Sequence, residues 1–183
     1  MTLRLIILLS ILTITSCAEK KCETSKQNNQ IGKISFATSG CYGKCPFLSI
    51  EIDSSLSYKF YGGRYTEKQG FFIGTITKEF WDSLNIKFEQ INYDYLDTLY
   101  NGTVDDMAIE CYIYNGQNKK PLYAQEMDLP DKVRNFFYWL MDTYKNLELR
   151  KVDTLHFETK IQFGQGPMPP PKIMKFRPPK IEE

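Results

Sequence analysis

The sequence predicts an α+β domain, in which a mostly antiparallel sheet carries two helices packed on one face. Two patterns lead to this fold class. Apolar side chains first alternate with polar ones, as in half-buried strands, and then recur at helical spacing from Thr77 onward. Short turns separate the successive strands, and such turns join antiparallel neighbours. The expected order is four strands, a helix, two strands and a second helix.

Four strands are expected before residue 77. A turn over residues 38–46, which holds Gly40, Gly43 and Pro46, separates the first strand from the second. An Asp-Ser-Ser turn and a Gly-Gly break mark the next two boundaries. The apolar positions of the four strands are Ile34 and Phe36; Leu48, Ile50 and Ile52; Tyr58 and Phe60; and Phe71 to Ile76.

The period then changes. Thr77 is a suitable N-cap for a helix over residues 77–92, where apolar residues recur every three or four positions. Alternation returns over residues 109–113, which include Cys111. A hairpin turn over 115–118 then leads into a sixth strand over 121–127.

A second helix is expected over residues 129–145. Asp128 is a plausible N-cap, and Pro130 fits the first turn of a helix. Beyond this helix, residues 155–163 alternate and are expected to add an edge strand. The expected core face of the helix is Val133, Phe136, Phe137, Leu140 and Tyr144.

The first sixteen residues have the layout of an export signal. Arg4 supplies a positive start, an apolar run follows, and the small polar residues Thr15 and Ser16 precede Cys17. The ending Ile-Thr-Ser-Cys resembles the lipobox of bacterial lipoproteins, in which the cysteine is acylated and becomes the mature N-terminus. The resemblance implies a protein that is exported and held in the lipid bilayer through Cys17, and several acyl chains make such anchoring durable. The other interpretation is an ordinary signal peptide with a coincidental cysteine.

The rest of the chain divides by composition. Residues 17–30 are polar and form the expected tether, and residues 31–151 form the α+β domain. Residues 152–183 hold the expected edge strand and a tail with six prolines from Gly164 onward. Proline fixes an extended backbone and lacks an N–H group, so this tail is expected to be extended and to add little stability.

One cysteine motif stands out, in the turn over residues 38–46. Cys41 and Cys45 are four residues apart, with glycines around them and Pro46 directly after. Export favours oxidation, so a structural disulfide that closes the turn is the first interpretation. A thiol site that exchanges disulfides, or one that binds Cu(I) or zinc together with Cys111, is the alternative. Proline and a strand follow the motif, whereas activated thiols usually lie at the start of a helix.

The same segment resembles an uncharacterised family of exported proteins from Bacteroidota with a Cys-x-Gly-x-Cys-Pro motif. Cys41, Gly43, Cys45 and Pro46 match that motif, and the strand–turn–strand–helix layout further along the chain also fits. The resemblance extends over roughly residues 34–144. It supports the fold and the exported address and implies no activity. This chain departs from the family where an Asp-Gly turn often follows the second strand.

Composition argues against several function classes. The net charge of +1 provides no basic field for nucleic acid, and His156 is the single histidine, which argues against most acid–base and histidine-based metal catalysis. No catalytic residues and no cofactor are predicted. The expected function is therefore a non-catalytic envelope domain that binds a protein or glycan partner.

The acidic residues expected at the surface and in turns are Glu51, Asp53, Asp94, Asp97, Asp105 and Asp106. The tyrosines that either line a groove or pack on the sheet are Tyr42, Tyr58, Tyr61 and Tyr65.

Overall fold

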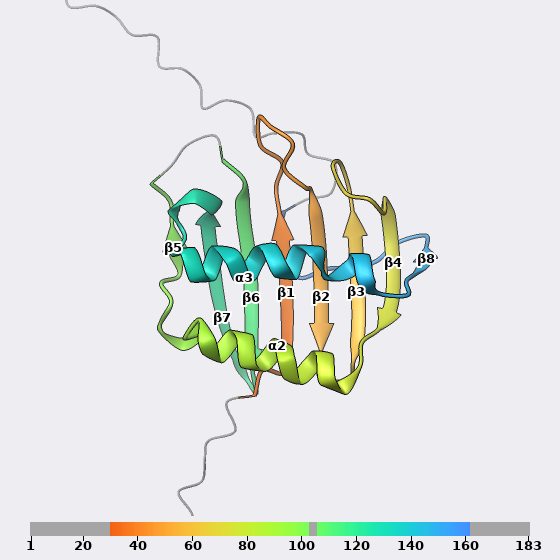
Figure 1. Cartoon of the computed structure of the whole chain (residues 1–183), viewed down its shortest axis with the longest axis horizontal. Coiled ribbons are helices and arrows are strands. Elements are labelled where there is room, and N and C mark those ends of the chain that lie inside the picture. Colours follow the sequence, from red (N-terminus) through yellow and green to blue (C-terminus); the bar gives the residue numbers. More distant parts are fainter. Residues whose placement is uncertain (1–29, 103–105, 162–183) are drawn as a thin grey trace, which may run out of the picture.

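An eight-stranded sheet and two α-helices make up the fold of the described residues, 30–102 and 106–161, of the computed structural model (Figure 1). The sheet is mostly antiparallel, so the predicted α+β class is confirmed. The expected leader, lipidated Cys17, most of the tether and the proline-rich tail lie outside the described residues.

The first four strands form an antiparallel meander, as the alternating pattern predicts. The meander consists of β1 (Lys33–Thr38), β2 (Leu48–Asp53), β3 (Ser57–Gly62) and β4 (Gly70–Thr75). On the other side of β1 lies the hairpin of β6 (Ala108–Asn115) and β7 (Asn118–Gln125). The strand order is β5-β7-β6-β1-β2-β3-β4-β8, which places β1 in the interior of the sheet.

Two edge strands correct the expected count of six. β5 (Leu99–Tyr100) pairs with β7 in parallel, and β8 (Arg150–Val152) pairs with β4. They hold two and three residues, too few for an alternation to stand out in the sequence. The edge strand expected over 155–163 is wrong, because residues 155–161 form no strand and β8 already occupies that edge. The last two residues of that range lie outside the described part of the chain.

The helices begin and end close to the expected residues. Thr77 caps α2 (Lys78–Gln90), and its side chain accepts a hydrogen bond from the Phe80 N–H at 3.2 Å. The N-cap of α3 (Asp131–Asp142) is Pro130, so the expected cap at Asp128 is wrong. The Asp128 carboxylate instead accepts a hydrogen bond from the Gly102 N–H at 2.6 Å.

Three short 3-10 helices occur in the described residues: η1 (Tyr93–Tyr95), η2 (Glu126–Asp128) and η3 (Thr143–Asn146). The second helix is therefore shorter than expected, since its last turn tightens into η3.

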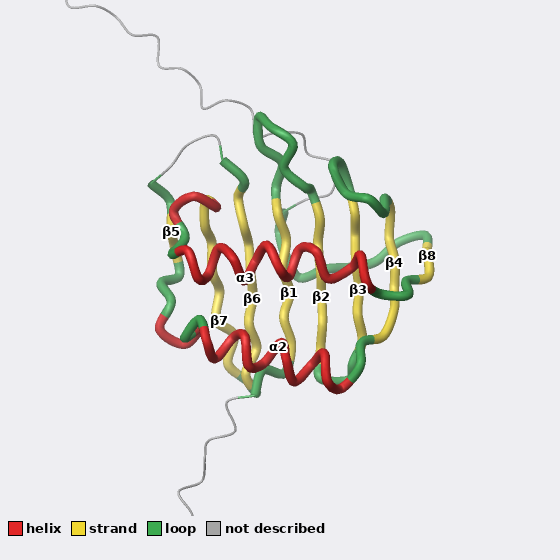
Figure 2. Tube along the Cα trace, viewed as in Figure 1, coloured by secondary structure: helices red, strands yellow, loops and turns green. Residues whose placement is uncertain are grey.

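Both helices cross in front of the sheet, and the core lies between the two layers (Figures 1 and 2). Phe36 of β1 stacks on Phe137 of α3 with ring centroids 5.1 Å apart, and Phe88 of α2 meets Phe136 of α3 edge to face at 4.5 Å. Burying such rings is the main source of stability in a domain of this size. All five residues expected on the core face of the second helix are buried: Val133, Phe136, Phe137, Leu140 and Tyr144.

The opposite face of the sheet is polar and is also covered. Residues 153–161, called the strap below, leave β8 and cross behind the sheet without forming a helix or strand (Figure 2). Glu51, expected at the surface, is only 4% exposed on this face. Lys33 and Lys59 pair with its carboxylate at 3.3 and 2.7 Å, and these two cations make its burial tolerable.

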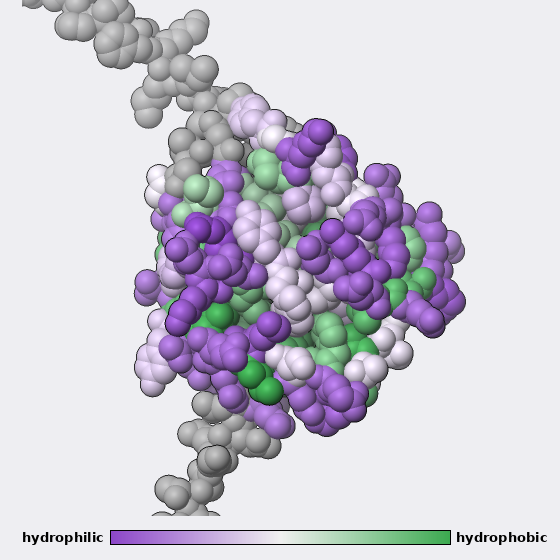
Figure 3. Space-filling view, viewed as in Figure 1, coloured by the Kyte–Doolittle hydropathy of each residue, from purple (hydrophilic) through white to green (hydrophobic). Residues whose placement is uncertain are grey.

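The outer surface on the helix side is mainly hydrophilic, with smaller apolar patches between charged groups (Figure 3). Within the described residues, neither helix has the length and apolar character needed to cross a membrane.

Candidate functional site

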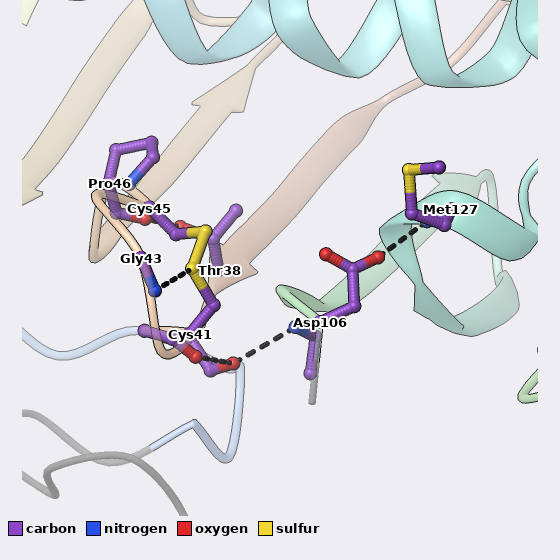
Figure 4. Close-up of a disulfide and its surroundings, with 10 residues drawn as sticks. Thr38, Cys41, Gly43, Cys45, Pro46, Asp106 and Met127 are labelled. Atoms are coloured by element: carbon purple, nitrogen blue, oxygen red, sulfur yellow. Dashed lines mark hydrogen bonds between the residues drawn. A yellow bond between two sulfur atoms is a disulfide. The ribbon is translucent and has the colours of Figure 1, made fainter. Parts of the chain in front are cut away.

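The turn between β1 and β2 is fixed at its base by one buried threonine. Thr38, the last residue of β1, is fully buried. Its hydroxyl donates to the Pro46 carbonyl at 2.6 Å and accepts from the Leu48 N–H at 3.3 Å. The side chain therefore holds the end of the turn against the end of β1, and Figure 4 shows Thr38 beside Cys45 and Pro46.

A disulfide closes the turn above this base. Cys41 and Cys45 are joined, with Cα atoms 5.6 Å apart, and the Gly43 N–H points at the Cys41 sulfur at 3.2 Å (Figure 4). Neither Gly40 nor Gly43 has a positive φ, and a Cβ at either position meets nothing closer than 3.6 Å. The bend itself therefore does not require glycine at either position. The disulfide and Pro46 shape the turn instead.

A second loop packs beside the turn because two glycines let it approach. The Phe47 N–H donates to the Arg64 carbonyl at 3.0 Å, and the Gly63 N–H donates to the Phe47 carbonyl at 2.7 Å. A Cβ on Gly63 would lie 2.7 Å from the Phe47 ring, and one on Gly62 would lie 1.8 Å from the Lys68 carbonyl oxygen. Gly63 thus lets Arg64 and Tyr65 lie beside the disulfide turn, and Gly62 lets the rest of the loop fold back on the end of β3.

Between the turn and this loop lies a hollow of about 180 Å³. Two exposed tyrosines contribute to its lining: Tyr42 of the turn is 67% exposed, and Tyr65 of the loop is 56% exposed with a left-handed φ of 61°. A non-glycine residue in this conformation stores strain, which neighbouring structure must offset. The complete lining is Gly40, Cys41, Tyr42, Gly43, Cys45, Phe47, Arg64 and Tyr65.

Two cations at this end of the sheet have no ionic partner among the described residues. Lys44 in the turn and Arg64 in the loop are both exposed, and neither forms an ion pair with any residue that the structure describes. A free guanidinium beside tyrosine rings is suited to a carboxylate or another planar anion. The hollow therefore combines a rigid backbone, two aromatic surfaces and positive charge.

The three cysteines of the alternative thiol site are not brought together as ligands. Cys41 and Cys45 are consumed by the disulfide, and Cys111 faces the core from β6 with no exposed surface. Burial raises the pKa of the Cys111 thiol far above its ordinary value, so the thiolate that a metal needs is disfavoured. Among the described residues, no group of three or more His, Cys, Asp or Glu side chains is placed to hold a metal ion.

The other residues considered from the sequence lie apart from the hollow. Tyr58 is fully buried, and its hydroxyl shares a hydrogen bond with Thr143 at 2.8 Å. Tyr61 packs against the Phe71 ring, with centroids 4.8 Å apart. His156 is exposed on the strap. The four tyrosines therefore divide, two packing on the sheet and two bordering the hollow.

The sequence alone does not predict that Arg64 lies beside the cysteine motif. The two are separated by about twenty residues, and they meet only because β2 and β3 form a hairpin. The one available signal was the Gly-Gly pair before Arg64, which marks a place where the backbone approaches another segment closely.

Two larger hollows flank Trp139 between the helices, with volumes of about 450 and 490 Å³. The Trp139 ring is already engaged, since Phe80 stacks on it at 5.8 Å and the Lys87 ammonium lies 4.7 Å from its centre. These contacts give the ring a packing role. The disulfide hollow is the stronger candidate for a binding site, because it has two exposed rings and an arginine that forms no ion pair with any described residue.

Comparison with known proteins identifies a family. A family model described as a domain of unknown function (DUF6438) matches residues 32–144, from the start of β1 through α3 and into η3. No match to a curated protein was found. The matched segment contains the disulfide turn, the Arg64 loop and both helices, and it ends before β8 and the strap.

Proposed function

We propose that this chain, which belongs to the DUF6438 family, is an exported lipoprotein whose domain binds a partner at the disulfide hollow and catalyses no reaction. The acylated Cys17 anchors it in the bilayer of the cell envelope, and residues 17–30 act as the tether. The partner is an envelope protein or a glycan, and nucleic acid is not a partner. The lipobox-like ending before Cys17 supports the anchor.

The proposal extends to the family itself. The Cys-x-Gly-x-Cys-Pro motif lies inside the matched residues, which favours the idea that the family corresponds to the exported Bacteroidota group that this segment resembles. On this view the disulfide turn is a shared structural element of the family, and the residues around it determine what each member binds.

One observation carries the binding function: Tyr42, Tyr65 and Arg64 line a hollow, one wall of which is a turn closed by a disulfide, and Arg64 forms no ion pair with the described residues. A backbone that a disulfide already constrains loses little conformational entropy when its side chains contact a partner. Tyrosine offers an apolar face and a polar hydroxyl, and arginine adds a planar cation. The expected partner therefore presents an acidic group next to a flat or apolar surface.

Site-specific photo-crosslinking in the intact, anchored protein tests this function. A photoreactive phenylalanine analogue in place of Tyr42 is expected to give a discrete product, and Arg64→Glu in the same chain is expected to abolish it. Tyr95 provides the matched control, because it is 89% exposed and lies in η1, away from the hollow. A product of equal yield from position 95, or one that survives the charge reversal, would count against binding at the hollow.

A further inference from the structure

The polar face of the sheet contains a second arrangement, separate from the disulfide hollow, that recognises a polypeptide backbone. Glu110 of β6 is 4% exposed, and one of its carboxylate oxygens accepts the N–H groups of Lys160 and Ile161 at 2.8 and 2.9 Å. Its other oxygen accepts from the Tyr112 hydroxyl. A buried carboxylate that binds two successive main-chain N–H groups holds an extended chain whatever side chains that chain carries.

A second part of the same face holds an acidic side chain. Glu158 of the strap reaches Lys33 of β1 and the Tyr114 hydroxyl of β6, and Lys119 of β7 lies 3.6 Å away. Lys119 also lies over the Tyr112 ring, 3.6 Å from its centre. Two lysines and a tyrosine from three different strands thus form a receptor for one carboxylate.

The strap fits this surface imperfectly. The hydroxyls of Ser35 on the sheet and Thr159 on the strap are buried without a hydrogen-bond partner in the described structure. Each such group gives up its hydrogen bonds to water on burial and gains none in return, which disfavours the closed position of the strap. The Glu158 side chain is 40% exposed, so solvent already reaches the ion pairs that hold the strap. The face is therefore built for an extended chain, and the strap leaves room for a better occupant.

The strap also lies outside the residues that the family model matches, which end at 144. Glu110, Lys33 and Lys119 lie inside them. The receptor thus belongs to the family domain, whereas its present occupant does not.

We propose that this face is a binding site for an extended acidic segment of a partner protein, and that the strap occupies it in cis until the partner displaces it. The partner segment presents a glutamate to Lys33 and Lys119, and two main-chain N–H groups to Glu110, as the strap does. This site does not rest on the function proposed for the disulfide hollow, so either can fail without the other.

A labelled peptide with the strap sequence, residues 155–161, is the probe, and the intact chain is the receptor. Glu158→Gln weakens the strap in cis and is expected to bind the probe at least tenfold more tightly than the wild type, in which the tethered strap competes at high effective concentration. Adding Lys119→Ala to Glu158→Gln is expected to abolish that binding. Glu89→Gln, a change at an exposed residue on α2, is the matched control and is expected to behave as the wild type.

Hydrogen exchange supplies a second measurement on the unmodified protein. The amides of Lys160 and Ile161 are expected to exchange through strap opening, faster than core amides of β1. Exchange only at the rate of global unfolding, or failure of the Glu158→Gln chain to bind the probe, would overturn the proposal, because the strap would then be a permanent part of the core. A strap-exchanged dimer of the wild type would also overturn it, by assigning the face to a second copy.

Discussion

The disulfide between Cys41 and Cys45 should be worth about 2 kcal/mol of folding stability. The perturbation is the replacement of both cysteines by serine. The bond closes a loop with a sequence separation of only 4, and the chain-entropy relation gives about 7 cal/mol/K for so short a loop, or about 2 kcal/mol at room temperature. We expect the domain to stay folded, because Thr38 still bonds both the Pro46 carbonyl and the Leu48 N–H.

Urea-induced unfolding measures this loss. Trp81 and Trp139 lie on the two helices and provide a fluorescence signal for the folded state. The midpoint should fall with no change in the slope, since the surface exposed on unfolding stays nearly the same. Chemical reduction of the wild type should reproduce the loss, and reduction of the double-serine chain should change nothing. A single Cys22→Ser change is the control and should leave the midpoint unaltered.

Two results would refute this reasoning. A loss below about 0.5 kcal/mol would mean that the Thr38 hydrogen bonds alone define the turn and that the unfolded chain gains little from losing the bond. The second result is copper or zinc that binds tightly to the native protein and not to the double-serine chain. It would show that Cys41 and Cys45 act as thiolate ligands and would support the metal-site interpretation.

Four further outcomes are expected. Mass spectrometry of the mature protein should find an acylated Cys17 at the N-terminus; an unmodified terminus at any other residue contradicts the anchor. Removal of residues 164–183 should leave the melting temperature nearly unchanged, and a drop of more than a few degrees would show that the tail packs on the domain. Gly63→Ala should destabilise by about 1–3 kcal/mol in urea unfolding, because the new Cβ meets the Phe47 ring at 2.7 Å; Gly40→Ala, with open space around it, is the matched control. Burial raises the pKa of Glu158, but hydrogen bonds from Lys33 and Tyr114 and the nearby lysine charges outweigh burial and hold that pKa below its ordinary value of 4.5. The contact between the strap and the sheet is therefore present above pH 4.5 and is lost as the pH falls through the lowered pKa. Hydrogen exchange of the strap amides at different pH values should report this loss.

The sequence was most informative where one face of an element is apolar. Ile34 and Phe36 alternate with polar residues, so the strand and its buried face were predictable, and the same holds for Phe136 and Phe137 on α3. Glu51 shows the limit of this argument. Its polar position in the alternation indicates solvent, but a segment about a hundred residues further along the chain covers that face, and periodicity carries no information about such a cover.

The edges of the sheet and the start of α3 could not be predicted for different reasons. β5 and β8 have too few residues to show a period, so only their partners β7 and β4 define them. Asp128 has the chemistry of an N-cap, but a tertiary hydrogen bond from Gly102 takes its carboxylate. A local propensity of about 1 kcal/mol is easily outweighed by such a contact.

The candidate site was predictable only in part. The cysteine motif is local and visible in the sequence. The hollow is not, because its second wall comes from Arg64 and Tyr65 on another strand connection. Sequence reasoning finds the covalent element of a site more readily than the surface that the fold builds around it.

The direction of β1 has a mechanical consequence. The chain enters this strand at Lys33, on the tether side, and leaves it at Thr38, directly below the disulfide turn, about 20 Å away for six extended residues. If Cys17 holds the membrane and a partner holds the turn, tension between them runs along β1. The covalent backbone of β1 carries this pull from Lys33 to Thr38, so the hydrogen-bonded ladders to β2 and β6 lie outside the path of the force. The rest of the sheet is therefore held beside a loaded strand without being stretched between the anchor and the partner.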